Sequence, residues 1–321
     1  MKKGLVFGKF MPVHQGHIAL IAFAAAQCDQ LIVSMNCTPA DSIAPEKRME
    51  WLRALFGDRD DIELVQVWDD FSDDSLPLWE ATRLWSDFIK QRFPDIDGFF
   101  CSEPYGEPLS HHLGLPCVWF DRERRQVPVS ATLIRQHPAR YWDFIPDVVK
   151  PYFVKKVCLF GPESVGKTTL AERLAGHYHT VFVHEVARDL ITSNDLTLDD
   201  YVQIGHAQTD AVLKATESAN RLLICDTDLI TTELYSEHYL NEVPPVLYEL
   251  EKQVVYDRYF LLNIDVPWVA DGLRDLGHRR EEMYQRFKTA LEARGIAYID
   301  VSGDWEQRWA KVTGEIDRLL A

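Results

Sequence analysis

The chain has 321 residues, a length that favours two domains of ordinary size over a single one. Its 34 basic and 50 acidic side chains give a formal net charge of -16. Residues 1–150 carry 16 basic and 22 acidic groups and residues 151–321 carry 18 and 28, so both halves are acidic. A domain that binds nucleic acid normally has a basic face, and we therefore expect small-molecule partners and no nucleic acid.

Other features of the sequence indicate a cytoplasmic protein. No apolar stretch approaches the ~20 residues of a membrane span, and no export signal precedes the first apolar run. The six cysteines form no Cys-x-x-Cys pair, which is typical of buried free thiols in a reducing cytosol. We therefore predict no membrane contact and no helix-turn-helix module before residue 4, while the sequence leaves a homo-oligomer open.

Short apolar runs alternate with helical patterns through the first half of the chain. We expect strands at residues 5–7, 30–35, 62–67, 98–101 and 116–120, and helices at residues 16–27, 46–56 and 78–92. This alternation predicts βαβ units that build a parallel sheet.

A second series of the same kind follows an aromatic, proline-bounded connector at residues 141–151. We expect strands at residues 154–160, 181–184, 221–225, 258–264 and 296–301, with one helix from residue 167 and a long one at residues 198–218. The sequence therefore predicts an α/β protein with two domains, residues 1–150 and residues 151–321, each built on its own parallel sheet.

The segment GKFMPVHQGH at residues 8–17 begins where the first expected strand ends. Gly16 and His17 begin the next helix, so His14 and His17 flank a helix N-terminus, where free N–H groups and the helix dipole favour anions. Two imidazoles three positions apart can also donate hydrogen bonds to an α-phosphate as charge develops on it. A second segment, VSATLIR at residues 129–135, follows later in the chain.

Together the two segments resemble the HxGH and (I/V)SxTxxR motifs of the nucleotidyltransferase superfamily. The resemblance implies a Rossmann-like domain in which His14 and His17 are catalytic and an acceptor phosphate attacks the α-phosphorus of ATP, releasing pyrophosphate. It also implies that ATP is bound by Gly8, Lys9, Phe10, Ser130, Thr132 and Arg135. Class I tRNA synthetases share the histidine motif, but they need a KMSKS-like loop and an RNA-binding domain, and the sequence has neither.

The segment GPESVGKT at residues 161–168 lies between an expected strand and an expected helix, which is the context that a P-loop requires. Its backbone N–H groups can surround phosphate, Lys167 can reach the β- and γ-phosphates, and the Thr168 hydroxyl can ligate Mg²⁺. The predicted ATP-binding residues are Gly161, Pro162, Glu163, Ser164, Val165, Gly166, Lys167, Thr168 and Thr169.

Carboxylates follow two of the later strands. Asp226 ends an apolar strand in the usual position on the metal side, so we predict Mg²⁺ as cofactor, with Thr168 and Asp226 as its ligands and ATP as co-substrate. Either Glu185 or Asp228 can accept the proton of an attacking hydroxyl. For Glu185 the alternative is a structural ion pair with Arg188. The catalytic candidates are therefore Lys167, Glu185, Asp226 and Asp228.

A run of arginines at residues 274–280 has Gly272 before it and Gly277 within it. Such a segment is typical of a lid over a transferring phosphate, and we predict that Arg274 and Arg279 bind ATP. A solvated loop is the alternative. Trp268 precedes this run and is a candidate for stacking on the substrate base, with Arg188 as a second substrate-binding candidate. The alternative for Trp268 is ordinary packing.

A histidine nucleotidyltransferase followed by a P-loop kinase resembles the bifunctional NadR-type family of nicotinamide mononucleotide adenylyltransferases and ribosylnicotinamide kinases. The resemblance is densest at residues 129–170 and recurs at residues 184–189, 204–208, 226–228 and 267–274. It implies that the C-terminal domain phosphorylates ribosylnicotinamide and that the N-terminal domain adenylylates the resulting nicotinamide mononucleotide. The small-molecule partners would be ATP, ribosylnicotinamide, nicotinamide mononucleotide and NAD.

Two other interpretations stay open. The same two chemistries can act on a different nucleoside or cofactor precursor. The chain can also be an ATP-dependent regulator that senses pyridine nucleotides, although such a regulator needs a nucleic-acid or protein partner surface, which the acidic balance of both halves disfavours.

Overall fold

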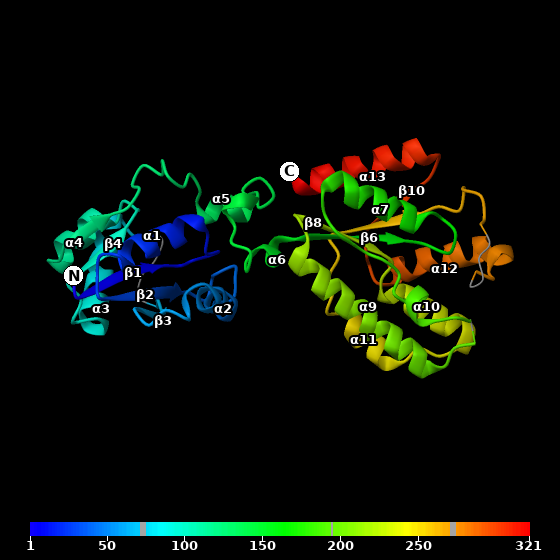
Figure 1. The fold of residues 1–321 in the computed structure, drawn as a ribbon, viewed down its shortest axis with the longest axis horizontal. Helices are drawn as coiled ribbons and strands as arrows, with labels where there is room; N and C mark the ends of the chain where they lie inside the picture. Colours follow the sequence, from blue (N-terminus) through cyan, green and yellow to red (C-terminus); the bar gives the residue numbers. More distant parts are fainter. Residues whose placement is uncertain (71–74, 194, 270–273) are drawn as a thin grey trace. The chain divides into compact units, whose positions relative to one another are not determined.

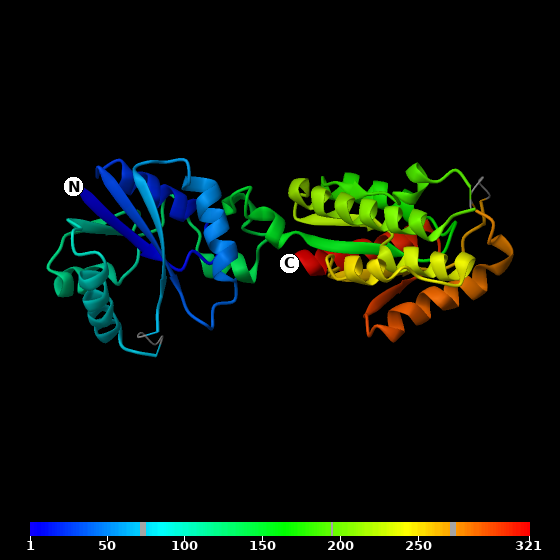
Figure 2. The same cartoon turned by 90° about the horizontal axis from the view of Figure 1, so that it is seen from below.

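The computed structural model describes residues 1–70, 75–193, 195–269 and 274–321. The chain divides into two compact units, Met1–Lys150 and Pro151–Ala321. Each unit contains one five-stranded sheet in which every pair of neighbouring strands is parallel, with helices packed around it (Figures 1 and 2). The predicted fold class, α/β with two parallel sheets, is therefore confirmed.

In the N-terminal unit the strand order is β3-β2-β1-β4-β5. The strands are β1 (Lys3–Gly8), β2 (Gln30–Cys37), β3 (Ile62–Trp68), β4 (Gly98–Cys101) and β5 (Cys117–Trp119). The helices are α1 (Gln15–Ala25), α2 (Pro45–Phe56), α3 (Leu78–Arg92), α4 (Gly106–Leu113) and α5 (Ala131–Gln136), followed by the 3-10 turn η1 (Trp142–Phe144). The short α6 (Lys150–Phe153) spans the boundary between the two units. The chain reverses its direction of strand addition beside β1, and the carboxyl end of such a strand is where open α/β sheets bind ligands.

In the C-terminal unit the strand order is β10-β9-β6-β8-β7. The strands are β6 (Lys155–Phe160), β7 (Phe182–Val183), β8 (Leu222–Asp226), β9 (Arg258–Leu262) and β10 (Tyr298–Val301). The helices are α7 (Lys167–Tyr178), α8 (Ala187–Leu190), α9 (Leu198–Ser218), α10 (Leu229–Leu240), α11 (Pro245–Glu251), α12 (Arg280–Ala293) and α13 (Trp305–Leu320), with the 3-10 turn η2 (Gly277–Arg279). Here too the central strand, β6, has a later strand on each side.

The central strands are largely apolar because helices cover both faces of the sheets. All five residues of β8 are buried, as are the last four of β6. In the N-terminal unit β2 is buried from its second residue to Cys37, two residues beyond the predicted end. Helices α3 and α9 have the predicted bounds, whereas α4, α10, α11, α12 and α13 had not been assigned from the sequence.

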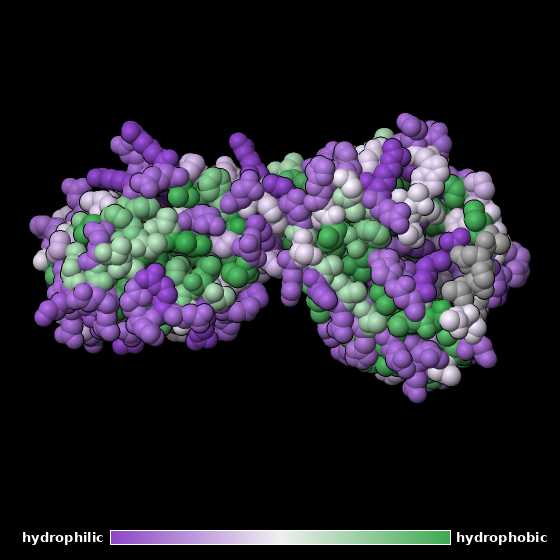
Figure 3. Space-filling model, in the orientation of Figure 1, coloured by the Kyte–Doolittle hydropathy of each residue, from purple (hydrophilic) through white to green (hydrophobic). Residues whose placement is uncertain are grey.

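Hydrophilic side chains surround separate apolar areas on the face of each unit that Figure 3 shows. Among the described helices, none is both long enough and apolar enough to cross a membrane. The six cysteines are free thiols, and four of them are buried; Cys28 and Cys117 are partly exposed.

Candidate active sites

The two histidines of the first motif lie between β1 and α1. His14 is the N-cap of α1, with extended backbone angles, and its Nδ1 accepts a hydrogen bond from the Gly16 N–H at 3.1 Å. The Nδ1 of His17 accepts one from the His14 N–H at 3.3 Å. Since a neutral imidazole carries its proton on the nitrogen that does not accept, both rings are held as the tautomer with a proton on Nε2.

Burial keeps this pair neutral. Loss of solvent lowers the pKa of His14 to about 3 and the pKa of His17 well below its ordinary value, and the nearby Arg124 guanidinium lowers both further. The rings are stacked with centroids 3.8 Å apart, and the edge of His17 meets Phe10. Two stacked imidazoles cannot both ionise without strong repulsion, so the pair offers two neutral N–H donors near neutral pH.

A cavity of about 460 Å³ opens beside this pair. Its lining includes all but one of the ATP-binding residues predicted for this unit, namely Gly8, Lys9, Phe10, Ser130 and Thr132, together with His14 and His17. Arg135 does not line it. The Arg135 guanidinium instead donates to the carbonyl of Met11 and to the Thr132 hydroxyl, so Arg135 supports the loop that precedes the histidines.

The same cavity contains a cation that the sequence reasoning missed. Arg124 donates to the Val129 carbonyl at 2.9 Å and to the Glu103 carboxylate, and both Arg124 and Glu103 line the cavity. Asp121 orders this loop by accepting hydrogen bonds from the backbone N–H groups of residues 125–127. The basic run directly before the VSATLIR segment was the available signal.

In the C-terminal unit the P-loop follows β6 and ends in the first turn of α7. Gly161 and Gly166 have φ angles of 138° and 89°, in the region that favours glycine, and a Cβ on Gly161 would lie 2.9 Å from the Leu262 carbonyl oxygen. The Lys167 ammonium donates to the carbonyls of Gly161 and Pro162 at 2.9 and 3.0 Å. It therefore lies across the loop whose backbone N–H groups are suited to phosphate.

A buried arginine of α13 is hydrogen-bonded to the P-loop backbone and stabilises the loop. Arg308 has no exposed surface and donates to the carbonyls of Val165 and Asn263 at 2.9 and 2.8 Å and to the Asp265 carboxylate. Nothing in the sequence distinguished this arginine from the exposed ones, because its role depends on where α13 packs.

The predicted metal ligands lie together at the loop. The Thr168 hydroxyl donates to Oδ2 of Asp226 at 2.5 Å, and Oδ1 of Asp226 is buried without a hydrogen-bond partner in the described part of the chain. Burial raises the Asp226 pKa, against the opposing effect of Lys167. No cluster of three or more metal-binding side chains occurs among the described residues, but Mg²⁺ in nucleotide sites needs only one or two protein ligands beside phosphate and water. The orphaned carboxylate oxygen fits that ion.

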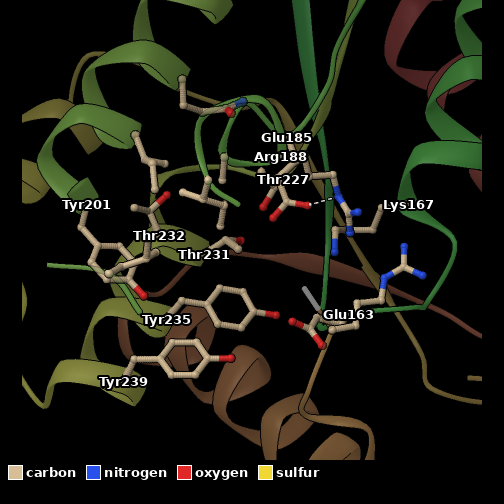
Figure 4. A pocket seen from close by; sticks show the side chains of 16 residues that line it. Glu163, Lys167, Glu185, Arg188, Tyr201, Thr227, Thr231, Thr232, Tyr235 and Tyr239 are labelled. Carbon is tan, nitrogen blue, oxygen red and sulfur yellow. Dashed lines mark hydrogen bonds and ion pairs between the residues drawn. The ribbon is translucent and has the colours of Figure 1, made fainter. Parts of the chain in front are cut away.

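Next to the P-loop lies a second cavity, which Figure 4 shows from close by. Glu163 and Lys167 lie on one side of it, Glu185 and Arg188 at another, and three tyrosine rings face them. Glu185 accepts a hydrogen bond from Arg188 Nε at 3.0 Å. The cavity is lined by Glu163, Lys167, Glu185, Ala187, Arg188, Ile191, Leu196, Tyr201, Ile204, Gln208, Thr227, Thr231, Thr232, Tyr235, Tyr239 and Arg274. The tyrosines had not been predicted.

Asp228, the other candidate for proton acceptor, does not line this cavity. It is the N-cap of α10, where it accepts hydrogen bonds from the Thr231 N–H and hydroxyl at 3.1 and 3.2 Å and from the Tyr259 hydroxyl at 2.9 Å. Burial raises its pKa to about 6. Of the two candidates, only Glu185 faces the cavity.

The predicted arginine lid is brought together only in part. Arg274 lines the cavity, whereas Arg279 pairs with Glu282 of α12 and lies outside it. Trp268 also lies outside this lining; it packs against Gly277 and beneath the Arg280 guanidinium, the alternative that the sequence left open. The predicted hinge Gly272 falls outside the described residues.

These two sites, on two parallel sheets, define a two-domain ATP-using transferase with a nucleotidyltransferase-like unit followed by a P-loop unit. Models of two known families match accordingly: the cytidylyltransferase-like family at residues 5–137 and the AAA domain at residues 156–308.

Whole-chain relatives carry both units in the same order. The chain is 32% identical to the trifunctional NAD biosynthesis/regulator protein NadR of Escherichia coli K12, over 99% of this chain and 83% of that protein, and equally so to NadR of Salmonella typhimurium LT2. It therefore belongs to the NadR family, as the motifs predicted. The nicotinamide-nucleotide adenylyltransferase of Thermococcus onnurineus is 26% identical over 49% of the chain.

Solved structures agree in fold. A NadR protein in complex with NAD and AMP-PNP matches with a TM-score of 0.81 at 22% identity, covering 99% of this chain and 96% of that one. A NadR protein in complex with NR matches with a TM-score of 0.78 at 24% identity, over 99% and 95%.

Proposed function

We propose that this chain catalyses two consecutive ATP-dependent steps of NAD formation. The P-loop unit phosphorylates ribosylnicotinamide to nicotinamide mononucleotide, and the histidine unit transfers AMP from ATP to that mononucleotide. The observation that carries the proposal is that one chain, related along 99% of its length to NadR proteins, brings the histidine motif and the P-loop each to a cavity of its own. We assign residues 1–150 to the adenylyltransferase and residues 151–321 to the kinase.

In the kinase step, the 5′-hydroxyl oxygen of the nucleoside attacks the γ-phosphorus of ATP and ADP leaves. Glu185 faces the cavity next to Lys167, so it accepts the hydroxyl proton. Lys167 and the loop backbone balance the charge on the transferring group. Thr168 and Asp226 would hold Mg²⁺, which supplies further positive charge to the β- and γ-phosphates when bound.

In the adenylyl transfer, a phosphate oxygen of nicotinamide mononucleotide attacks the α-phosphorus and pyrophosphate leaves. The Nε2–H groups of His14 and His17 donate to the nonbridging oxygens as negative charge develops on them, without a change in their own protonation. Lys9, Ser130 and Thr132 line the same cavity and bind the leaving phosphates.

Product analysis tests the proposal directly. Purified protein is incubated with ribosylnicotinamide, ATP and Mg²⁺, and the nucleotides are separated at successive times. We expect nicotinamide mononucleotide to appear first and NAD to follow, with ADP and pyrophosphate released in equal amounts once conversion is complete. ADP without pyrophosphate would contradict the adenylyltransferase assignment. A panel of other nucleosides in the same assay tests whether a different acceptor is preferred.

A further inference from the structure

Glu163 is the P-loop residue whose side chain leaves the phosphate-binding loop. Figure 4 shows its carboxylate directed into the cavity next to the P-loop, which the proposed kinase reaction assigns to the acceptor nucleoside and which is called the acceptor cavity below. The hydroxyl of Tyr235 points toward this carboxylate from the opposite wall. The residue lines both this cavity and a smaller adjoining one beside Trp268. One of the four unspecified positions of the G-x-x-x-x-G-K-[ST] pattern thus faces this cavity.

The protein leaves this carboxylate incompletely satisfied. A hydrogen bond from the Leu276 backbone reaches it, but Oε2 is buried and has no hydrogen-bond partner among the residues that the structure describes. Burial raises the Glu163 pKa to about 7, and the negative charges of Asp275 and Glu185 act in the same direction. A buried, unpartnered carboxylate oxygen is costly, so its presence in the cavity indicates that a ligand supplies the missing positive charge or hydrogen.

The cationic side chains around the cavity interact with groups other than Glu163. The Lys167 ammonium lies across the P-loop, where phosphate binds, and the Arg188 guanidinium pairs with Glu185. Nη1 of Arg274 donates to the Val269 carbonyl at 2.9 Å. The charge near Glu163 therefore stays negative when ATP neutralises Lys167, and a cationic acceptor would offset it.

The rest of the wall suits a flat cationic ring. The rings of Tyr201, Tyr235 and Tyr239 line the side of the cavity opposite Glu163. Aromatic faces attract cations through their quadrupole, most strongly where water is excluded. A carboxylate on one wall and tyrosine rings on the other form a suitable site for an N-glycosylated pyridinium, which is planar and positively charged.

We propose that Glu163 is the residue by which the kinase site selects a cationic nucleoside over a neutral one of the same shape. Its carboxylate lies against the positively charged ring while the tyrosines bound the ring on the other side. The inference rests on the proposed kinase function. It adds that the site distinguishes acceptors by their charge.

The test compares two acceptors. Ribosylnicotinamide carries a pyridinium ring, and benzamide riboside is its neutral C-nucleoside counterpart of nearly the same shape. Phosphorylation of each by Mg·ATP is measured as kcat/KM for the wild type, Glu163→Gln, Glu163→Asp and the control Glu172→Gln, an exposed acid on α7. The KM for ATP is recorded for every variant, because damage to the P-loop would raise it.

We expect the wild type to prefer the cationic nucleoside and Glu163→Gln to reduce that preference by about 10- to 100-fold, the worth of one buried charged contact. Glu163→Asp should retain most of the preference, and Glu172→Gln all of it. An equal loss on both nucleosides in Glu163→Gln, or a preference that survives the substitution, would overturn the inference while leaving the kinase function intact. If the wild type binds ATP but phosphorylates neither nucleoside, both the proposed function and the inference are wrong.

Discussion

His14 and His17 lie with their rings stacked 3.8 Å apart, and each accepts a backbone hydrogen bond at Nδ1. The backbone of the helix start therefore fixes the tautomer of both residues. Because burial keeps the rings neutral, we expect both to donate hydrogen bonds to phosphate without a proton having to bind first. The account of adenylyl transfer depends on this arrangement.

The stability of the N-terminal unit should fall in acid because His14 is buried as the neutral form. Its pKa is about 3 in the folded protein and about 6.5 when unfolded, so the unfolded chain binds more protons between these values. Stability is complete above pH 6.5 and declines below it, by about 2 kcal/mol at pH 5 for this residue alone. Urea unfolding of the N-terminal unit at pH 7.5 and pH 5 measures the decline. His14→Gln should make it shallower, and an unchanged decline would contradict the assignment.

Gly16→Ala should impair adenylyl transfer while leaving the kinase active. A Cβ at Gly16 would lie 2.9 Å from Cε1 and 3.0 Å from Nδ1 of His14, so the ring must move from the position that its hydrogen bond fixes. We expect kcat to fall by about 10- to 100-fold. Gly176→Ala is the matched control, because nothing lies within 4 Å of its added Cβ. A fully active Gly16→Ala enzyme would show that the ring position is not critical.

Glu185→Gln and Asp228→Asn should have different effects. Glu185 faces the acceptor cavity, so its substitution should lower the kinase kcat by about 10²- to 10⁴-fold with little change in the KM for ATP. Asp228 caps α10, and its substitution should mainly lower stability, by about 1 kcal/mol. Steady-state kinetics and thermal unfolding of both variants decide between them. The reverse pattern would make Asp228 the proton acceptor.

Arg308→Met should destabilise the C-terminal unit by about 3–5 kcal/mol, because it leaves the carbonyls of Val165, Asn263 and Gly303 without their donor and removes the ion pair with Asp265. Hydrogen exchange of β6 peptides in urea would detect the loss. Arg318→Met, on the exposed side of the same helix, should change the stability little. An equal loss of stability in the two variants would mean that Arg308 does not stabilise the P-loop.

The sequence predicted those parts of the molecule that local chemistry determines. The alternation of strands and helices predicted the two parallel sheets, and the glycines and histidines of the motifs pointed to the segments that line the two cavities. Residues whose role depends on tertiary packing could not be predicted from the sequence. Arg308 comes from a helix 140 positions after the P-loop. Tyr235 reaches the acceptor cavity only because α10 crosses it.

The same limit explains the residues that the structure separates from the sites. Asp228 follows Asp226 by two positions, but Asp226 is the last residue of β8 whereas Asp228 is the N-cap of α10. Arg279 looked equivalent to Arg274 as a lid residue, and Trp268 was a candidate for stacking on the substrate base. Arg279 forms an ion pair with Glu282 of α12, and the Trp268 ring packs against Gly277. Neither side chain therefore faces the cavity.

The most direct test of the two-site account uses one variant at each site. The wild type, His17→Ala and Lys167→Ala are each supplied with ribosylnicotinamide and, separately, with nicotinamide mononucleotide, with Mg·ATP in both cases. We predict that His17→Ala accumulates nicotinamide mononucleotide from ribosylnicotinamide and makes no NAD, whereas Lys167→Ala makes NAD only from the supplied mononucleotide. Loss of both activities in either variant, with its fold intact by circular dichroism, would contradict the account.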